Sequence, residues 1–482
     1  MLLDIVHRTK RVRRRNVSVK AIIKSNCVPV RAAASRTASS RDLLLLSACL
    51  AVAPFASAAS ALAQNAIPQP VVPDAAKPAA GSSVPPGTTT SAPVTAPAPA
   101  AAPPASWAST ISLGLQIEGG IQGNGDRPAD GLNYGRLFDD KANTVLLNQV
   151  QLTATRPINS SATGYDVGFT LQGTYGSDVR YLHYLGEFTN VTRSRDQVTL
   201  LQANVLLHAP WLTAGGIDFK LGQFVTPIGY ETIDPSTNPF YSHSYIFNYG
   251  PFQHTGLLGV AHLTPTLDLY GQVDTGESTT FGSGSGDNNS EPAGLFGIGL
   301  NNLLGGKLTL LGLTHLGPEN ALRVDPQANS QMRYESDVIA TYKHNSKLTF
   351  VTELNYQHDD GFGADSYAAA QYISYALTPT VTLNGRAEVY RDNAGFFVFT
   401  YPGTLDPVHA LKGLSNSSFT AGRATYSEYT VGFTYKPSVP KVATLMFRPE
   451  IRWDKSLSGT RAYDALRQTG NFTFGGDIVL GF

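Results

Sequence analysis

Cysteine is almost absent from this chain of 482 residues, and its only two cysteines, Cys27 and Cys49, both fall within the first 63 residues. The rest of the chain has no thiol, which excludes thiol catalysis and cysteine-ligated metals there. The sequence also lacks a zinc-binding His-Glu-x-x-His, a Walker loop and a nucleotide-binding glycine fingerprint. We therefore expect no enzyme, no cofactor, no metal site and no nucleic-acid partner.

Charged residues and long apolar runs are also scarce. Only 15% of the residues are charged, and no segment after residue 63 approaches the roughly 18 uninterrupted apolar residues of a transmembrane helix. A membrane span in this chain would have to be a closed barrel, because only closure satisfies every backbone hydrogen bond of a sheet in lipid. The 46 glycines, 22 tyrosines and 22 phenylalanines make a mixture that is unusual for a cytosolic enzyme.

Residues 1–63 predict a removable secretory signal peptide. They carry eleven Lys and Arg against two Asp, and an apolar stretch begins at Leu43. A small-residue site at 61–63 precedes Gln64, so we expect cleavage after Ala63 and Sec-type export. The residues around Cys49 also resemble a lipoprotein cleavage box, which leaves a lipidated N-terminus as the alternative.

Residues 64–106 predict an unstructured periplasmic spacer. Residues 65–106 contain eleven Pro and twelve Ala, with Asp74 and Lys77 as their only charges. Such a composition cannot bury a core and favours extended, polyproline-like conformations. Contact with peptidoglycan or a protein partner is the alternative role for this segment.

From Trp107 onward, apolar and polar residues alternate, which places successive side chains on opposite faces of a strand. Residues 111–118, 347–356 and 428–435 show the pattern. Counting such segments gives about sixteen strands over residues 107–482, within the range of bacterial barrels. A soluble sandwich alternates in the same way, so the connections must separate the two folds.

The predicted connections alternate in length. We expect short turns at residues 157–163, 263–266, 305–306, 345–346, 377–380 and 437–441. We expect long polar loops at residues 125–142, 176–196, 232–253, 277–291, 317–330, 393–425 and 456–469. The fold class predicted is all-β, a transmembrane antiparallel up-and-down β-barrel over residues 107–482, with short periplasmic turns and long extracellular loops.

The last predicted strand carries an apolar face that ends on a C-terminal phenylalanine. Its members are Phe472, Phe474, Gly476, Ile478, Leu480 and Phe482. This arrangement resembles the C-terminal signal that the barrel-assembly machinery recognises in outer-membrane proteins, with Phe482 as its final residue. An ordinary amphipathic terminal strand is the alternative.

Two predicted strands, at residues 381–392 and 445–454, place charges on the face opposite to their apolar residues. Such charges are costly near lipid and must face water. Two interpretations stay open: a wet pore whose opposing charges tune ion passage, or a salt-bridge network that neutralises the lumen wall. Pro449 lacks a backbone donor and predicts a bulge in the second strand. The pore-lining candidates are Arg386, Glu388, Arg448, Glu450, Arg452 and Asp454.

Residues 222–258 run from one predicted strand through an aromatic-rich connection into the next. They resemble the hallmark region of the OmpL-like β-barrel porins, and residues 448–454 are similar to the late strand of that family. The resemblance covers the predicted barrel and not the spacer. It implies an outer-membrane barrel that forms a pore and names no substrate. The matching residues are Gly222, Phe224, Thr226, Pro227, Gly229, Glu231, Tyr241, Ser242, Tyr245, Phe252, His254, Thr255 and Gly256.

The connection at residues 232–253 is too aromatic for a freely solvated loop, because its Tyr and Phe side chains need burial. We expect it to fold into the barrel and narrow the lumen. Packing over the rim or at the membrane interface is the alternative. The constriction candidates are Glu231, Asp234, Tyr241, His243 and Tyr245.

These observations together predict a porin of a Gram-negative-type outer membrane, through which small hydrophilic solutes or ions diffuse passively. A barrel of about sixteen strands is wide enough for an aqueous channel unless a loop plugs it. The alternatives are a surface-interaction or adhesin-type barrel without an open pore and, with less support, an outer-membrane lipase. The expected partners are outer-membrane lipid, the barrel-assembly machinery and small solutes, and assembly into a homo-oligomer is left open.

Overall fold

The computed structural model describes residues 106–482 except 189–193, 283–285, 403–407 and 414–417. The predicted signal peptide and all but the last residue of the predicted spacer lie outside the described residues. The strands are β1 (Ser112–Asn124), β2 (Val145–Arg156), β3 (Asp166–Gly176), β4 (Gln197–Ala209), β5 (Ile217–Val225), β6 (Gln253–Thr264), β7 (Leu267–Glu277), β8 (Ala293–Asn302), β9 (Leu308–Gly317), β10 (Arg333–Lys343), β11 (Leu348–Asp359), β12 (Ala364–Thr378), β13 (Val381–Asp392), β14 (Ala424–Tyr435), β15 (Thr444–Phe447), β16 (Glu450–Ser456) and β17 (Gly470–Gly481).

Short helical segments lie before the first strand and in the connections. None of the described helices is long and apolar enough to cross a membrane. The segments are η2 (Trp107–Thr110), η3 (Asp178–Tyr181), η4 (Pro235–Thr237), α2 (Tyr245–Tyr249), α3 (Leu303–Gly306), η5 (Ala328–Ser330), α4 (Val408–Leu411) and α5 (Tyr463–Leu466).

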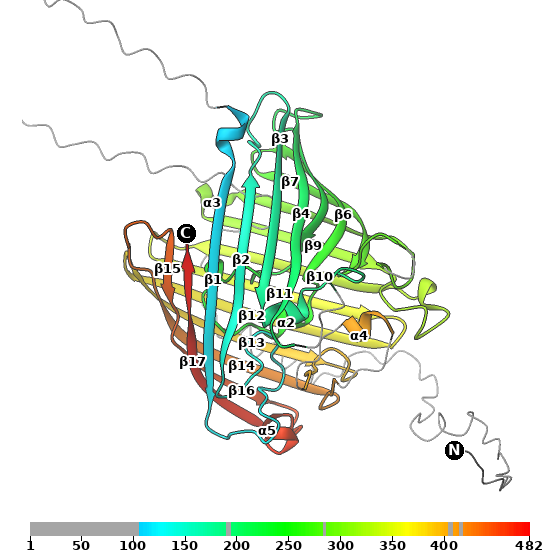
Figure 1. Ribbon diagram of the computed structural model, residues 1–482, viewed down its shortest axis with the longest axis vertical. Helices are drawn as coiled ribbons and strands as arrows, with labels where there is room; N and C mark the ends of the chain where they lie inside the picture. Colours follow the sequence, from blue (N-terminus) through cyan, green and yellow to red (C-terminus); the bar gives the residue numbers. More distant parts are fainter. Residues whose placement is uncertain (1–105, 189–193, 283–285, 403–407, 414–417) are drawn as a thin grey trace, which may run out of the picture. The chain divides into compact units, whose positions relative to one another are not determined.

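The strands form a closed antiparallel barrel (Figure 1). Neighbours along the chain lie side by side, and β1 pairs with β17 through residues 116–124 to close the ring. The segments β15 and β16 pair with the same two neighbours, β14 and β17, and are two halves of one interrupted strand. Within the described residues the barrel therefore has sixteen strands, which confirms the predicted fold class.

The interruption between β15 and β16 falls at Arg448 and Pro449, where the sequence predicts a bulge. The Phe433 N–H donates to the Pro449 carbonyl at 3.0 Å, and the Arg448 N–H donates to the Asp477 carbonyl at 3.2 Å. On the facing strand, Gly476 has a φ of +150°, and a Cβ there would lie 2.2 Å from the Arg448 carbonyl oxygen. The bulge therefore requires glycine at position 476.

We expect Gly476→Ala to lower the free energy of unfolding by about 1–3 kcal/mol, because the added methyl group meets backbone atoms that cannot move aside. Urea unfolding in detergent, followed by tryptophan fluorescence, measures the change. Gly385→Ala on β13 is the matched control, since a Cβ there would have nothing within 4 Å. Equal unfolding midpoints for the two variants would show that the close approach is not restrictive.

The two faces of each strand differ in the way that the alternation predicts. On β16, Ile451 and Trp453 are 51% and 48% exposed on the outside, whereas Arg452 between them is 1% exposed. On β17, Phe472 and Phe474 are exposed and Thr473 is buried. The barrel therefore presents an apolar outer surface and a polar inner one, as expected for strands that face lipid.

Short turns close one end of the barrel, and most of the connections at the other end are long. All thirteen predicted connections are present within a few residues of their expected bounds. The prediction omitted the turns at 210–216 and 360–363. The first of these turns carries Trp211 and Leu212 between two strands that also contain apolar residues. Because the turn is itself apolar, the sequence pattern does not mark where one strand ends and the next begins. Both ends of the barrel chain meet at the short-turn end, where the Phe482 N–H donates to the Leu115 carbonyl at 2.9 Å.

Candidate functional site in the barrel lumen

The connection between β5 and β6, residues 226–252, lies inside the barrel and is here called the inner loop. Its Tyr245 N–H donates to Glu388 Oε2 of β13 at 2.7 Å, and its Tyr241 N–H donates to Glu450 Oε2 of β16 at 2.9 Å. From β11, Gln357 Nε2 donates to the Tyr249 carbonyl at 2.7 Å. These side chains of β11, β13 and β16 point inward. The inner loop therefore crosses the lumen from β5 and β6 to strands on the other side of the ring.

The local sequence of the inner loop explains its shape. The Asp234 carboxylate accepts the Ser236 N–H at 2.9 Å and starts η4, while Ser244 Oγ accepts the Phe247 N–H at 3.1 Å and starts α2. Both contacts satisfy helix donors that would otherwise be orphaned. The aromatic side chains of the loop obtain the burial that they need; these are Phe240, Tyr241, Tyr245, Phe247, Tyr249 and Phe252.

Arg386 of β13 links the barrel wall to the inner loop. Its guanidinium contacts Glu428 of β14 at 2.5 Å and Glu231 of the inner loop at 2.6 Å. It also donates to the Ser242 carbonyl at 2.8 Å. A planar guanidinium with five donors suits this role, because it can bind a wall carboxylate and the loop backbone at the same time.

Arg448, between β15 and β16, and Arg452 of β16 repeat this arrangement two strands away from Arg386. Arg448 pairs with Asp477 of β17 and donates to the carbonyls of Pro235 and Asn238, at 2.7 and 2.9 Å. Arg452 pairs with Asp454 at 2.7 Å and donates to the carbonyl of an inner-loop residue, His243. Each of the three wall arginines therefore joins a carboxylate to the backbone of the inner loop.

A second loop, residues 125–144 between β1 and β2, also enters the lumen. Arg136 is fully buried and pairs with Asp139 at 2.8 Å and with Asp454 at 2.6 Å. Sequence reasoning missed Arg136, because it follows a glycine in a loop without strand alternation. The sequence signal that could have indicated it is an inward-facing carboxylate, such as Asp454, which can pair with a cation from a loop.

All five constriction candidates contact strand side chains. The list of contacts is Glu231 to Arg386, Asp234 to Gln116 at 2.9 Å, Tyr241 Oη to Asn148 at 3.0 Å, the His243 carbonyl to Arg452, and Tyr245 Oη to Asp454 at 3.1 Å. The imidazole of His243 turns back to Glu231 of its own loop, with Nδ1 2.7 Å from the carboxylate.

A cavity of about 450 Å³ lies at the long-loop end of the barrel. Its lining combines aromatic rings with polar and charged groups, among them Asn248, Tyr249, Glu319, Arg333, Gln357 and Phe399. The side-chain amide of Asn248 is buried, and neither its oxygen nor its nitrogen bonds to another described group. Such a lining suits a hydrophilic solute that also has apolar faces.

Asp178 in η3, within the connection between β3 and β4, is a buried carboxylate. Burial raises the pKa of Asp178 to about 7, and hydrogen bonds from Gln149 and Asn148, at 3.0 and 2.8 Å, oppose the increase. The folded protein therefore keeps this proton more readily than the unfolded chain. It follows that Asp178 makes the barrel progressively less stable as the pH rises from about 4 to about 7.

We expect Asp178→Asn, which mimics the protonated acid, to gain stability over the wild type as the pH rises through this window. The gain is at most about 1.4 kcal/mol for each pH unit. Urea midpoints at pH 5 and pH 8 measure it. The idea fails if the difference between the two proteins is the same at both pH values.

A lipase would need a hydroxyl and an imidazole within hydrogen-bond reach, and the neighbouring pairs in the sequence are His243–Ser244 and His254–Thr255. Neither pair forms such a dyad in this geometry. Ser244 Oγ is engaged by the Phe247 N–H, as described above. The Thr255 hydroxyl donates to the Thr279 carbonyl at 2.8 Å, while His254 Nε2 lies 3.1 Å from Thr226 Oγ1. The hydroxyls of both pairs are thus directed to groups other than the adjacent imidazole.

A closed sixteen-stranded barrel with an apolar exterior, a polar interior and loops of unequal length at its two ends defines the class of outer-membrane β-barrels. Within that class the chain belongs to the family described as "Putative beta-barrel porin-2, OmpL-like", which it matches over residues 110–482. The protein is thus a porin-like barrel of the outer membrane.

Three solved structures are among those to which the chain is similar. The channel DcaP of Acinetobacter baumannii is 12% identical, with 77% of this chain and 97% of that chain covered and a TM-score of 0.45. OprB of Pseudomonas putida is 14% identical over 77% and 94% of the two chains, with a TM-score of 0.48. An anion-selective porin from Comamonas acidovorans is 10% identical over 77% and 99%, with a TM-score of 0.48. No curated protein matches the sequence.

Proposed function

We propose that the protein is a diffusion porin that lets small hydrophilic solutes or ions pass through its lumen, with the inner loop as the constriction. The observation that carries the proposal is the attachment of the inner loop, which starts from β5 and ends at β6, to β13 and β16 on the other side of the ring, through Arg386, Glu388 and Glu450. A loop held at several points inside a closed barrel narrows the lumen without abolishing it. The cavity of about 450 Å³ above the loop serves as the entrance for solutes.

The charged residues of the wall have a second role in this proposal. Arg386, Arg448 and Arg452 all pair with carboxylates, so their charges are largely neutralised within the wall. We assign them the task of fixing the position of the inner loop. The channel should then discriminate only weakly between cations and anions, since paired charges leave a small net field.

Planar bilayers test the proposal. The chain isolated from outer membranes should give stable conductance steps, and deletion of residues 240–250 should enlarge them because it removes the centre of the inner loop. Folding of both forms is checked by the shift in electrophoretic mobility on boiling. An absence of conductance from folded protein in both forms would refute the diffusion proposal.

A surface-interaction barrel without an open pore is the second candidate, and one observation favours it. Arg136, Arg448 and Arg452 are each at most 1% exposed, which is unusually low for residues of a water-filled lumen. In this case the two loops would plug the barrel, and the long loops would bind a partner. Folded protein that stays closed in bilayers even after the deletion would support this candidate.

We propose further that residues 1–63 are removed after export, with cleavage after Ala63, and that residues 64–106 lie in the periplasm. The basic and apolar segments of the leader and the small residues at 61–63 support this assignment. Mass spectrometry of the protein isolated from outer membranes should give an N-terminus at Gln64. A lipidated Cys49 would instead support the lipoprotein alternative.

We propose that the barrel-assembly machinery reads the terminal strand, including Phe482. The backbone of Phe482 extends the β1–β17 pairing, and its side chain is 52% exposed on the outside. Removal of Phe482 should lower the amount of folded barrel in the outer membrane severalfold and leave refolding in detergent unchanged. Equal losses in cells and in detergent would point to a simple defect in stability.

A further inference from the structure

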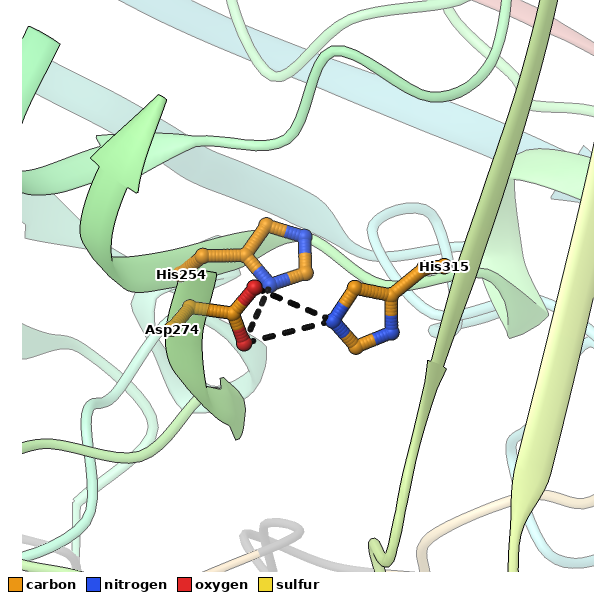
Figure 2. Close-up of side chains that lie close together, drawn as sticks. All are labelled: His254, Asp274 and His315. Carbon is orange, nitrogen blue, oxygen red and sulfur yellow. Dashed lines mark hydrogen bonds and ion pairs between the residues drawn. The ribbon is translucent and has the colours of Figure 1, made fainter. Parts of the chain in front are cut away.

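Three residues from three different strands meet near the long-loop end of the barrel. They are His254 at the start of β6, Asp274 on β7 and His315 on β9 (Figure 2). One ligand atom from each lies within 4.8 Å of the others. All three side chains are buried, with exposures of 0%, 4% and 1%.

One of the two His–carboxylate contacts in this cluster, His254 to Asp274, is longer than a hydrogen bond. His315 Nε2 lies 3.2 Å from Asp274 Oδ1, and His254 Nδ1 lies 3.7 Å from the same oxygen. Elsewhere in the described barrel, each histidine that pairs with a carboxylate has one carboxylate oxygen within 2.7 Å, and His262 and His358 also have a second carboxylate at 3.2 and 3.0 Å. The pairs are His208 and Asp218 at 2.6 Å, His243 and Glu231 at 2.7 Å, His262 and Asp268 at 2.7 Å, and His358 and Asp365 at 2.7 Å.

The wider separations match those around a bound metal ion. Donor atoms at about 2.0–2.1 Å from a tetrahedral Zn²⁺ ion lie about 3.3 Å from one another. The Asp274–His315 distance is close to this value, and the Asp274–His254 distance exceeds it by a few tenths of an ångström. Small movements of the side chains would bring all three donors to such an ion.

An unsatisfied nitrogen points to the same place. His254 Nδ1 has no hydrogen-bond partner among the described residues, although it is buried and faces Asp274. The other nitrogen, Nε2, is 3.1 Å from Thr226 Oγ1. If Nε2 donates its hydrogen to Thr226, the Nδ1 lone pair faces a carboxylate, and only a proton or a cation between them relieves the repulsion.

Neighbouring groups hold the candidate ligands in place. Asp274 accepts hydrogen bonds from Gln272 Nε2 at 2.6 Å and from the Gly276 N–H at 2.8 Å. Glu319 Oε1 lies 3.9 Å from His315 Nδ1, on the side of the ring away from Asp274. At this distance the carboxylate does not hydrogen-bond the ring, but its negative charge favours a hydrogen on Nδ1, which would leave Nε2 bare toward a metal. Glu319 also lines the cavity of about 450 Å³, which supplies a route for an ion from outside.

We propose that His254, Asp274 and His315 form a binding site for a divalent transition-metal ion, for which Zn²⁺ is the best match. Two imidazoles and one carboxylate are borderline ligands that favour such ions over Ca²⁺ or Mg²⁺. The sequence predicted no metal site, because the three residues are separated by 20 and 41 positions and form no motif. The site lies where the inner loop joins the barrel, since His254 is the second residue after the loop and Thr226 is the first residue of the loop.

Metal binding to the full chain tests the proposal independently of conductance. The protein, purified without a polyhistidine tag and treated with EDTA, is titrated with Zn²⁺ and with Ca²⁺ by calorimetry. We expect one Zn²⁺ per chain and no binding of Ca²⁺. His254→Gln and His315→Gln should each weaken Zn²⁺ binding about 10- to 100-fold. His344→Gln, which changes an exposed histidine at the short-turn end, is the matched control and should leave the affinity unchanged.

If a histidine variant fails to fold, X-ray absorption at the zinc edge of the wild-type protein still tests the proposal. Wild-type protein loaded with one equivalent should show two imidazole ligands at about 2.0 Å. Failure of the wild type to bind Zn²⁺, a zinc shell without imidazole, or equal affinities in the His254 and His344 variants would overturn the proposal. If the wild type does not bind Zn²⁺, the three residues form only a network of ionisable groups.

Discussion

Glu388→Ala combined with Glu450→Ala is expected to enlarge the single-channel conductance severalfold while the barrel stays folded. Glu388 accepts the N–H groups of Tyr245 and Ile246, and Glu450 accepts those of Tyr241 and Ser242. Each hydrogen bond to a charged acceptor contributes about 1.5–3 kcal/mol. Removing both carboxylates therefore frees four backbone donors and detaches the middle of the inner loop from β13 and β16.

Conductance in planar bilayers and protease sensitivity of the inner loop measure this effect together. Glu291→Ala is the control, because Glu291 lies in an outer loop, where it contacts Asn329 at 3.1 Å. A release of the loop should raise both readouts in the double variant and neither in the control. If the double variant folds and its conductance equals that of the wild type, the inner loop is not the constriction.

Arg448→Ala is expected to cost about 3–5 kcal/mol of unfolding free energy or to prevent assembly of the barrel. Arg448 is 1% exposed and lies between Asp477 and Glu118, with the carbonyls of Pro235 and Asn238 also on its donors. Without the guanidinium, two buried carboxylates face each other with no cation between them. The inner loop loses one of its anchors at the same time.

The urea midpoint of refolded protein measures the loss, and two further variants make it interpretable. Arg461→Ala, at an exposed arginine in the last long loop, should change stability by less than about 0.5 kcal/mol. Arg448→Lys should fall between the two alanine variants, because lysine keeps the charge but lacks the planar set of five donors. A cost for Arg448→Ala no larger than that for Arg461→Ala would contradict the anchoring role.

Much of the fold was predictable from the sequence because its causes are local. Strand alternation needs only the two-residue period of the pleat, so the outward placement of Ile451 and Trp453 and the inward placement of Arg452 follow from the order of residues. The bulge at Pro449 follows from its missing N–H. The turn at 210–216 was missed for an equally local reason, since Trp211 and Leu212 continue the apolar pattern of the strands around it.

The site was predictable only in part. Alternation identified Arg386, Glu388 and Arg452 as inward-facing, and the aromatic content of residues 232–253 indicated a loop that must be buried. Alternation does not reveal partners, so it left open whether the charges faced water or one another. In the folded barrel, Glu388 meets the N–H of Tyr245, which lies 143 positions away along the chain.

The sequence by itself determined the strands, their two faces, the turns and the membership of an outer-membrane barrel family, because periodicity and turn chemistry act over a few residues. Only the tertiary structure decided which charges pair, where Arg136 enters the lumen, and that His254, Asp274 and His315 meet. Closure of the ring sets those contacts, since it fixes the register of every strand against its neighbours and brings loops from distant parts of the chain into one enclosed space.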